Sequence, residues 1–200
     1  MNSTGLSNGR VGADAYYQWA IRFQAARSAK VVGSRFEVIL ENPSGKTGYA
    51  AGWRGDINWE LWDENLALPG TRLSVGTRVE NDLAGLEYVG NGAFPLISFE
   101  PAAVEKGDWY WLIVGNENAD PVHNYMSLDF LLGDTTQCSD MQVWWRWMEK
   151  GSYAPWQLKA GWLPSPVNIY YEDGFTQGYN GYEIDSAGNV VMGQQYGFIA

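Results

Sequence analysis

The chain has 200 residues, 46% of them hydrophobic, which is enough for one well-packed core or two small ones. Its formal net charge of −10 argues against nucleic acid and membranes as partners, because anionic polymers and anionic lipids are bound through clustered Lys and Arg. No apolar run reaches about 18 residues, so we expect no membrane-spanning segment.

The chain is rich in aromatic residues and glycine, with 11 Trp, 12 Tyr and 24 Gly. It has no long run of Ala, Leu, Glu and Lys, and this composition favours an all-β domain with many turns. A core seldom needs so many Trp, because each buried indole N–H requires a hydrogen-bond partner. We therefore expect some of these rings at a ligand-binding surface.

Residues 1–15 are small and polar and predict a flexible tail, followed by one domain over residues 16–200. The first strand is predicted over residues 18–25, where every second side chain is apolar. Residues 34–41 alternate apolar and charged side chains, as in a half-buried strand, and a Gly-rich loop follows over residues 42–55.

Residues 56–63 predict a strand with Trp59 and Leu61 pointing inward. Trp62 then projects from the opposite face, beside Glu60. An aromatic ring next to polar side chains suits a sugar, which has an apolar C–H face and hydroxyl groups. Packing against the second sheet or a long loop is the alternative.

Further strands are predicted over residues 71–80, 94–99, 109–114, 124–132, 141–148, 167–171, 182–185 and 190–198. The strand over residues 109–114 is apolar on both faces, which is typical of a central strand. About ten strands separated by turns predict an all-β fold, a jelly-roll β-sandwich of two mainly antiparallel sheets.

The segment over residues 141–148 is dense in tryptophan. On a strand, Val143, Trp145 and Trp147 share one face, and Trp144, Arg146 and Met148 share the other. Only one face packs on the core, so one or two of these rings are expected at the surface. Loop aromatics nearby either belong to that surface or cap the ends of the sandwich.

We predict a ligand-binding set of aromatic and basic side chains drawn from loops and strand faces: Tyr49, Trp53, Trp62, Trp144, Arg146, Tyr153, Trp156 and Trp162. Several of them stand beside Gly or Pro, which hold loop rings rigidly at a surface.

Oxygen-bearing side chains recur in one polar segment, at Asn116, Asn118, Asp120 and Asn124. Alternate spacing of this kind lets a loop wrap a hard cation, and a structural calcium ion is one interpretation. The Gly and the distal Glu of an EF-hand are missing, and an ordinary Asn-rich turn is the other interpretation. No other cofactor is expected.

Catalytic motifs are not evident. His123 is the single histidine and has no obvious nucleophile partner. Glycoside hydrolysis needs two carboxylates that come from strands distant in sequence, and four glutamates are candidates for such a pair: Glu60, Glu100, Glu172 and Glu183. Solvated strand faces explain such residues equally well.

The first residues lack the charged start and apolar segment of a signal peptide, which fits a cytosolic protein or a mature secreted one. Cys138 is the single cysteine, so no intrachain disulfide is expected. We expect a secreted bacterial domain.

Five segments carry a resemblance: Ile21-Arg22-Phe23-Gln24-Ala25, Gly48-Tyr49-Ala50-Ala51-Gly52, Phe94-Pro95-Leu96-Ile97-Ser98-Phe99, Gly107-Asp108-Trp109-Tyr110 and Asn116-Glu117-Asn118-Ala119-Asp120-Pro121. Together they resemble a jelly-roll β-sandwich type of bacterial extracellular and polysaccharide-associated proteins. The resemblance spans roughly residues 19–131 and the end of the chain. It implies a carbohydrate-binding-module-like domain of the kind appended to polysaccharide-degrading enzymes.

Length and aromatic content are also similar to those of the small jelly-roll xylanases, which place two glutamates on facing strands of a cleft. In this chain Ser98 follows Pro95-Leu96-Ile97, where that family carries its nucleophilic glutamate. This departure argues against xylanase activity.

We predict non-catalytic binding of a polysaccharide or oligosaccharide, with Trp and Tyr rings stacked on pyranose faces. The negative net charge disfavours heavily anionic glycans unless Arg54 or Arg146 reverses it locally. A parent multi-domain enzyme is an expected partner. The alternatives are a β-sandwich glycoside hydrolase or polysaccharide lyase, and a structural or adhesive oligomeric domain.

Overall fold

The computed structural model describes residues 6–12, 15–36, 38–39, 57–78, 96–116, 125–132, 140–164, 167–179, 183–184, 190–191 and 195–198. These residues form antiparallel strands and turns and no helix, which confirms the predicted all-β class. None of them belongs to a helix long and apolar enough to cross a membrane.

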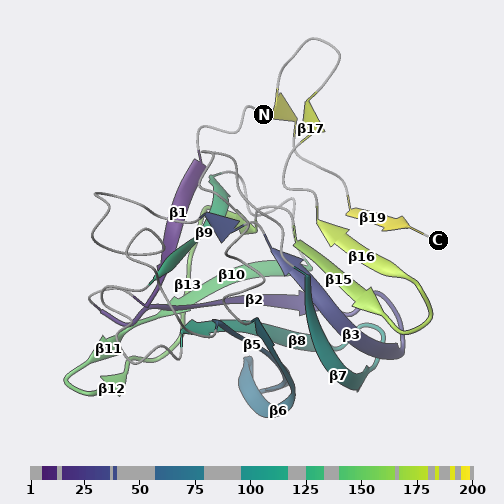
Figure 1. Cartoon of the computed structure of the whole chain (residues 1–200), viewed down its shortest axis with the longest axis horizontal. Helices are drawn as coiled ribbons and strands as arrows, with labels where there is room; N and C mark the ends of the chain where they lie inside the picture. Colours follow the sequence, from purple (N-terminus) through teal and green to yellow (C-terminus); the bar gives the residue numbers. More distant parts are fainter. Residues whose placement is uncertain are drawn as a thin grey trace.

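The largest sheet has six strands. Their spatial order is β13 (Gln157–Leu158), β10 (Met141–Arg146), β2 (Gln18–Gln24), β8 (Trp109–Asn116), β5 (Ile57–Asn65) and β6 (Leu68–Arg78). Every neighbouring pair is antiparallel, and β2, β8, β5 and β10 lie side by side in Figure 1.

Two further sheets lie against the six-stranded one. The five-stranded sheet has the order β19 (Gln195–Phe198), β16 (Thr176–Tyr179), β15 (Val167–Tyr171), β3 (Ala29–Phe36) and β7 (Leu96–Val104). The smaller sheet contains β1 (Leu6–Val11), β9 (Met126–Leu132) and β14 (Trp162–Pro164), with β4 (Val38–Ile39) paired to β9. Two hairpins complete the described strands, β11 (Met148–Glu149) with β12 (Ser152–Tyr153) and β17 (Glu183–Ile184) with β18 (Val190–Val191).

The main core is enclosed between these sheets. Leu61 and Leu112 come from the six-stranded sheet, Ile97 and Ile169 from the five-stranded sheet, and Phe130 from the smaller one; all are buried in one apolar cluster. Two layers that bury their facing apolar side chains make a β-sandwich. The jelly-roll connectivity stays a prediction.

Strand β8 is central, as its sequence predicts. It lies between β2 and β5, with Leu112 on the core side and Trp111 and Ile113 on the other face, and all three side chains are buried. A strand that is apolar on both faces therefore supports an apolar cluster on the side that faces away from the main core.

The structure differs from the expected tail over residues 1–15, because residues 6–11 form β1 and pair with β9. The segment LSNGRV has no apolar alternation, so its strand depends on a distant partner that a local pattern does not show. The strand predicted over residues 34–41 is also divided: β3 ends at Phe36, and the next strand joins a different sheet.

Candidate functional site

The face of the six-stranded sheet that points away from the main core carries a second apolar cluster. Its buried members are Ala20, Trp111 and Ile113, and the partly exposed Trp62, Trp144 and Trp156 pack against them. We call the four indoles of this cluster, Trp62, Trp111, Trp144 and Trp156, the outer tryptophan face. Period-two alternation on β5, β8 and β10 brings three of these rings to the same side.

Trp111 is the floor of the outer tryptophan face and is fully buried. Its ring centroid lies 5.1 Å from that of Trp144 and 5.9 Å from that of Trp156, with tilted planes. Trp62 is its direct cross-strand partner on β5. Aromatic pairs in tilted arrangements at these separations attract one another beyond their simple burial. The fixed ring of Trp111 therefore supports three partly exposed indoles.

Hydrogen bonds orient two of these exposed rings. Trp62 Nε1 donates to Glu60 Oε2 at 2.8 Å, and Trp144 Nε1 donates to Gln142 Oε1 at 3.1 Å. Each acceptor lies two residues before its tryptophan on the same strand, and therefore on the same face. Glu60 also accepts a hydrogen bond from Arg72 at 2.9 Å. The rings are thus held by their own strands before any ligand arrives.

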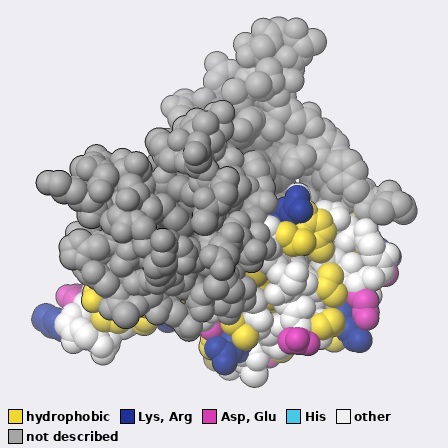
Figure 2. All heavy atoms as spheres, in the orientation of Figure 1, with side chains coloured by type: hydrophobic (Ala, Val, Ile, Leu, Met, Phe, Trp, Pro, Cys, Tyr) yellow, Lys and Arg dark blue, Asp and Glu magenta, His cyan; other side chains and the backbone are white. Residues whose placement is uncertain are grey.

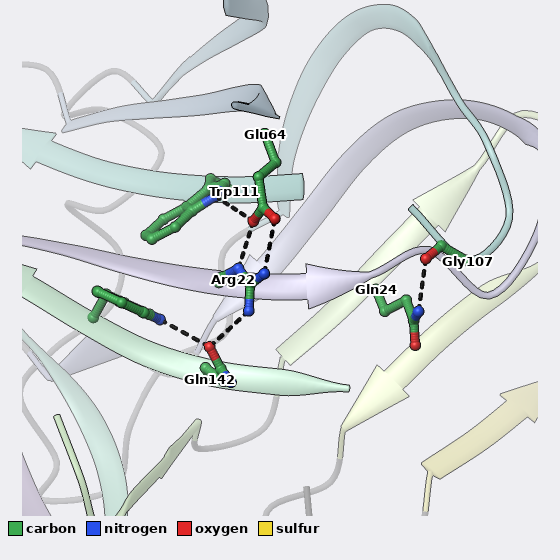
Figure 3. Close-up of polar contacts among 7 residues, drawn as sticks. Arg22, Gln24, Glu64, Gly107, Trp111 and Gln142 are labelled. Atoms are coloured by element: carbon green, nitrogen blue, oxygen red, sulfur yellow. Dashed lines mark hydrogen bonds and ion pairs between the residues drawn. The ribbon is translucent and has the colours of Figure 1, made fainter. Parts of the chain in front are cut away.

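A polar network crosses the sheet beside the tryptophans (Figure 3). Arg22 donates through Nε and Nη2 to the Glu64 carboxylate at 2.5 and 2.8 Å, and through Nη1 to Gln142 Oε1 at 2.9 Å. Trp111 Nε1 donates to the same carboxylate at 3.1 Å. The hydrogen bonds from Arg22 hold the pKa of Glu64 below its usual value, although burial acts in the opposite direction. The carboxylate is therefore ionised at neutral pH.

Arg146 lies between two aromatic rings at one end of the outer tryptophan face. Its guanidinium carbon is 4.3 Å from the ring centroid of Tyr153 and 4.5 Å from that of Trp156. Arg146 Nε donates to Gln18 Oε1 at 2.7 Å. Burial lowers the pKa of Arg146 and raises the pKa of Tyr153. No carboxylate of the described residues forms an ion pair with Arg146.

The other side of β10 carries a separate aromatic group. Trp19 lies between Trp145 and Trp162, with centroid separations of 5.9 and 5.3 Å and interplanar angles of 24° and 10°. Lys159 Nζ lies 4.5 Å from the ring centroid of Trp145 and 4.7 Å from that of Trp162. These side chains line an open hollow of about 460 Å³.

The structure divides the predicted ligand-binding set. Five of its members lie together on or beside the outer tryptophan face: Trp62, Trp144, Arg146, Tyr153 and Trp156. Trp162 lies on the other side of β10 and packs on the main core. Tyr49 and Trp53 fall outside the described residues.

The predicted calcium ligands are mostly outside the described residues, since Asn118, Asp120 and Asn124 have no described placement. Asn116 ends β8, and its side-chain amide donates to the carbonyl oxygen of Val11 at 3.2 Å. Across the described ranges, no cluster of three His, Cys, Asp or Glu side chains forms a metal site. The calcium site stays a prediction.

The candidate catalytic glutamates are distributed over different sheets. Glu60 is on β5, Glu100 on β7, Glu172 follows β15 and Glu183 begins β17. Glu60 pairs with Arg72, and Glu172 pairs with Lys30 at 3.4 Å. The described carboxyl group whose pKa departs clearly from its usual value is Glu64, and that pKa is lowered. A general acid needs the opposite direction.

Sequence reasoning missed several residues that shape these surfaces. Glu64 lies one residue beyond the strand predicted over residues 56–63, and its partner Arg22 is 42 residues away in the chain. Lys159 lies in a segment with no predicted strand. Trp111 was expected in a central strand but not as the support of other tryptophans. Only the alternation on β2, where Arg22 faces away from Ile21, contained a usable signal.

Comparison with known proteins gives no relative to place beside this arrangement. No protein-family model matches the chain, and neither a curated protein nor a solved structure matches it. The candidate site therefore rests on its own geometry.

Proposed function

We propose that this domain binds a glycan, without cleaving it, on the outer tryptophan face. The observation that carries the proposal is that three partly exposed indoles are fixed on one sheet face above the buried Trp111. Apolar rings interspersed with hydrogen-bonding groups match a sugar ring, which presents a C–H face and a rim of hydroxyl groups.

The rigidity of the rings favours binding. Trp62 and Trp144 are anchored through their N–H groups, and Arg146 restrains Trp156 by stacking on it. Side chains that are already ordered lose little rotamer entropy when a ligand is bound. A weakly polar ligand such as a sugar gains more from fixed rings than from mobile ones.

Donors for the ligand's oxygens lie next to the rings. The side-chain NH₂ group of Gln142 and the terminal nitrogens Nη1 and Nη2 of Arg146 donate no hydrogen bond to any described residue. Each lies beside a ring, Gln142 at Trp144 and Arg146 at Trp156. A sugar stacked on either indole therefore has hydrogen-bond donors available at its edge.

Affinity electrophoresis tests the proposal. The intact chain is run in native gels cast with a panel of neutral and acidic polysaccharides, and each polymer is then checked for a change in length. We expect retardation by one or two polymers that remain intact. A shortened polymer would contradict non-catalytic binding, and an absence of retardation by every polymer would contradict glycan binding.

The Trp156→Ala variant locates the site. Trp156 comes from a loop, and its indole N–H forms no hydrogen bond with a described residue, so its removal spares the sheet network. We expect binding to weaken at least about tenfold, equivalent to about 1.4 kcal/mol. Tyr170→Ala removes a partly exposed ring from β15 in the five-stranded sheet, away from the outer tryptophan face, and is the matched control. If both variants weaken binding equally, the glycan does not bind at the outer tryptophan face.

A further inference from the structure

The hollow on the other side of β10 is lined by Gly9, Arg10, Tyr17, Trp19, Trp145, Lys159 and Trp162. We call it the lysine hollow. Its volume of about 460 Å³ lies within the range of roughly 300–1,000 Å³ that is common for ligand pockets. No member of the outer tryptophan face lines this hollow, and of the predicted ligand-binding set only Trp162 does.

The charge of the lysine hollow is opposite to that of the chain. The net charge of the protein is −10, yet the described residues that line the hollow include Arg10 and Lys159 and no Asp or Glu. Arg27 and Lys30 each pair with a carboxylate, whereas Lys159 forms no ion pair with a described residue. On the side drawn in Figure 2, acidic and basic side chains are likewise interspersed among the coloured atoms. The hollow therefore favours an anion locally.

Lys159 is placed by the aromatic walls. Its ammonium lies 4.5 Å from the Trp145 ring and 4.7 Å from the Trp162 ring, an arrangement that attracts a cation to both indoles. The ammonium forms no ion pair and donates no hydrogen bond to the described residues. It carries three donors that a carboxylate accepts readily.

The floor of the hollow is flat and apolar. Trp19 is almost fully buried, its plane is nearly parallel to that of Trp162, and its Nε1 donates to the carbonyl oxygen of Arg10 at 2.8 Å. The Trp19 ring packs directly on the backbone of Gly9. A Cβ atom at Gly9 would lie 2.6 Å from Trp19 Cζ2 and would displace the ring. The hollow thus combines flat apolar walls with a fixed positive charge.

We infer that the lysine hollow binds a carboxylate-bearing sugar, a uronate residue of an acidic polysaccharide. The carboxylate would meet Lys159, and the C–H face of the ring would lie against the indole walls formed by Trp145 and Trp162. This site is separate from the outer tryptophan face, which carries no requirement for a charged sugar. The lysine hollow, in contrast, selects its ligand by charge. A neutral hexose has the same ring but gives Lys159 no anion, so it binds more weakly.

The test follows the indole N–H signals of the full-length ¹⁵N-labelled protein during titration with galacturonic acid or galactose. These two probes differ in the oxidation state of C6. Trp145→Phe and Trp162→Phe each remove one signal and so assign the hollow. We expect galacturonic acid to shift these two signals, with at least tenfold weaker binding of galactose. The signals of Trp62 and Trp144 report the outer tryptophan face in the same spectrum.

The Lys159→Met variant removes the charge and keeps the aliphatic stem, and Lys106→Met in the exposed β7–β8 turn is the matched control. We expect at least tenfold weaker galacturonic acid binding in the first variant and wild-type binding in the second. Equal binding of both sugars, unchanged binding in Lys159→Met, or no shift at Trp145 and Trp162 would overturn the inference. If Lys159→Met does not fold, the two sugars compared on the wild type decide. If the outer tryptophan face binds no glycan, the signals of Trp62 and Trp144 stay unchanged, while galacturonic acid still shifts those of Trp145 and Trp162.

Discussion

Arg22 on β2 and Glu64 on β5 form a two-bond ion pair across the intervening strand β8. Both side chains are largely buried, with 11% and 17% of their surfaces exposed. The guanidinium carbon of Arg22 lies 3.9 Å from the centroid of the Trp109 ring, and the Glu64 carboxylate also accepts a hydrogen bond from the Trp111 indole. The ion pair therefore ties the three central strands of the site-bearing sheet together.

Stability should depend on pH through Glu64. Its pKa in the folded protein lies below the ordinary value of 4.5, so the ionised form stabilises the fold above that value. This stabilisation is lost as the pH falls through the lowered pKa. We expect Glu64→Gln to reduce the free energy of unfolding at pH 7 by about 1.5–3 kcal/mol and to flatten its decline below pH 4.5.

Urea unfolding at a series of pH values measures this effect. Glu172→Gln is the control, because Glu172 and Lys30 are both more than half exposed and surface pairs contribute about 0–1 kcal/mol. A Glu64→Gln variant with the wild-type pH dependence would show that the pair does not couple protonation to folding.

Gly9 should tolerate no side chain. A Cβ atom there would lie 2.6 Å from Trp19 Cζ2 and 2.7 Å from Phe130 Cε2, and both rings are packed in the main core. We expect Gly9→Ala to destabilise the protein by about 1–3 kcal/mol, as for other overpacked cores. Thermal unfolding and near-ultraviolet circular dichroism measure the loss and the displacement of the indole.

Gly115→Ala is the matched control for this change. The nearest contact of its added Cβ is the movable end of the Gln18 side chain, at 3.2 Å. We expect a change within about 0.5 kcal/mol, as for substitutions without a severe clash. Similar losses in both variants would mean that the close approach at Gly9 is relieved by movement of Trp19.

The composition of the outer tryptophan face could be predicted in part because it depends on local alternation. Trp62 lies opposite Trp59 and Leu61, and Trp144 opposite Val143, as period two requires. The same rule located β2 and the central position of β8. Strand order decides which of these faces form one surface, and local alternation does not predict strand order.

The polar network and the lysine hollow could not be predicted for this reason. Arg22 meets Glu64 only because β8 lies between β2 and β5, and a bulge in β5 intervenes close to Glu64. Trp162 joins Trp19 through β14, a short strand in a segment with Gly and Pro that gave no strand signal. Such contacts depend on pairing between strands far apart in the sequence, and forming those pairs costs loop-closure entropy that no local pattern reflects.

A buried serine without a partner should be dispensable. Ser34 is fully buried in β3, and its Oγ makes no hydrogen bond to the described residues. Removing an unsatisfied hydroxyl relieves its desolvation, so we expect Ser34→Ala to leave stability unchanged or to raise it by up to about 1 kcal/mol. Ser74→Ala is the contrast, because Ser74 Oγ donates to the Glu100 carbonyl oxygen at 2.7 Å and should cost about 1 kcal/mol. Urea midpoints of the two variants give the comparison, and an equal loss in both would contradict it.

The β5–β6 hairpin turns through two residues that strain the backbone. Leu66 and Ala67 have φ values of 53° and 61°, in the left-handed region that Asn and Gly adopt far more easily than Leu and Ala. Leu66 is also 92% exposed, so it contributes no packing that a replacement would lose. We expect the double variant Leu66→Asn/Ala67→Gly to raise the free energy of unfolding by about 1–2 kcal/mol.

The β11–β12 turn provides the comparison for this prediction. Its second position is already a glycine, Gly151. In this turn, Lys150 is therefore the one non-glycine residue with a positive φ. Lys150→Asn should therefore give a smaller gain than the double variant, since only one position is relieved. Thermal unfolding of both variants orders the two effects. A larger gain in stability from Lys150→Asn, or a loss of stability in the double variant, would contradict the prediction. It would show that the positive φ values of Leu66 and Ala67 do not destabilise the β5–β6 turn.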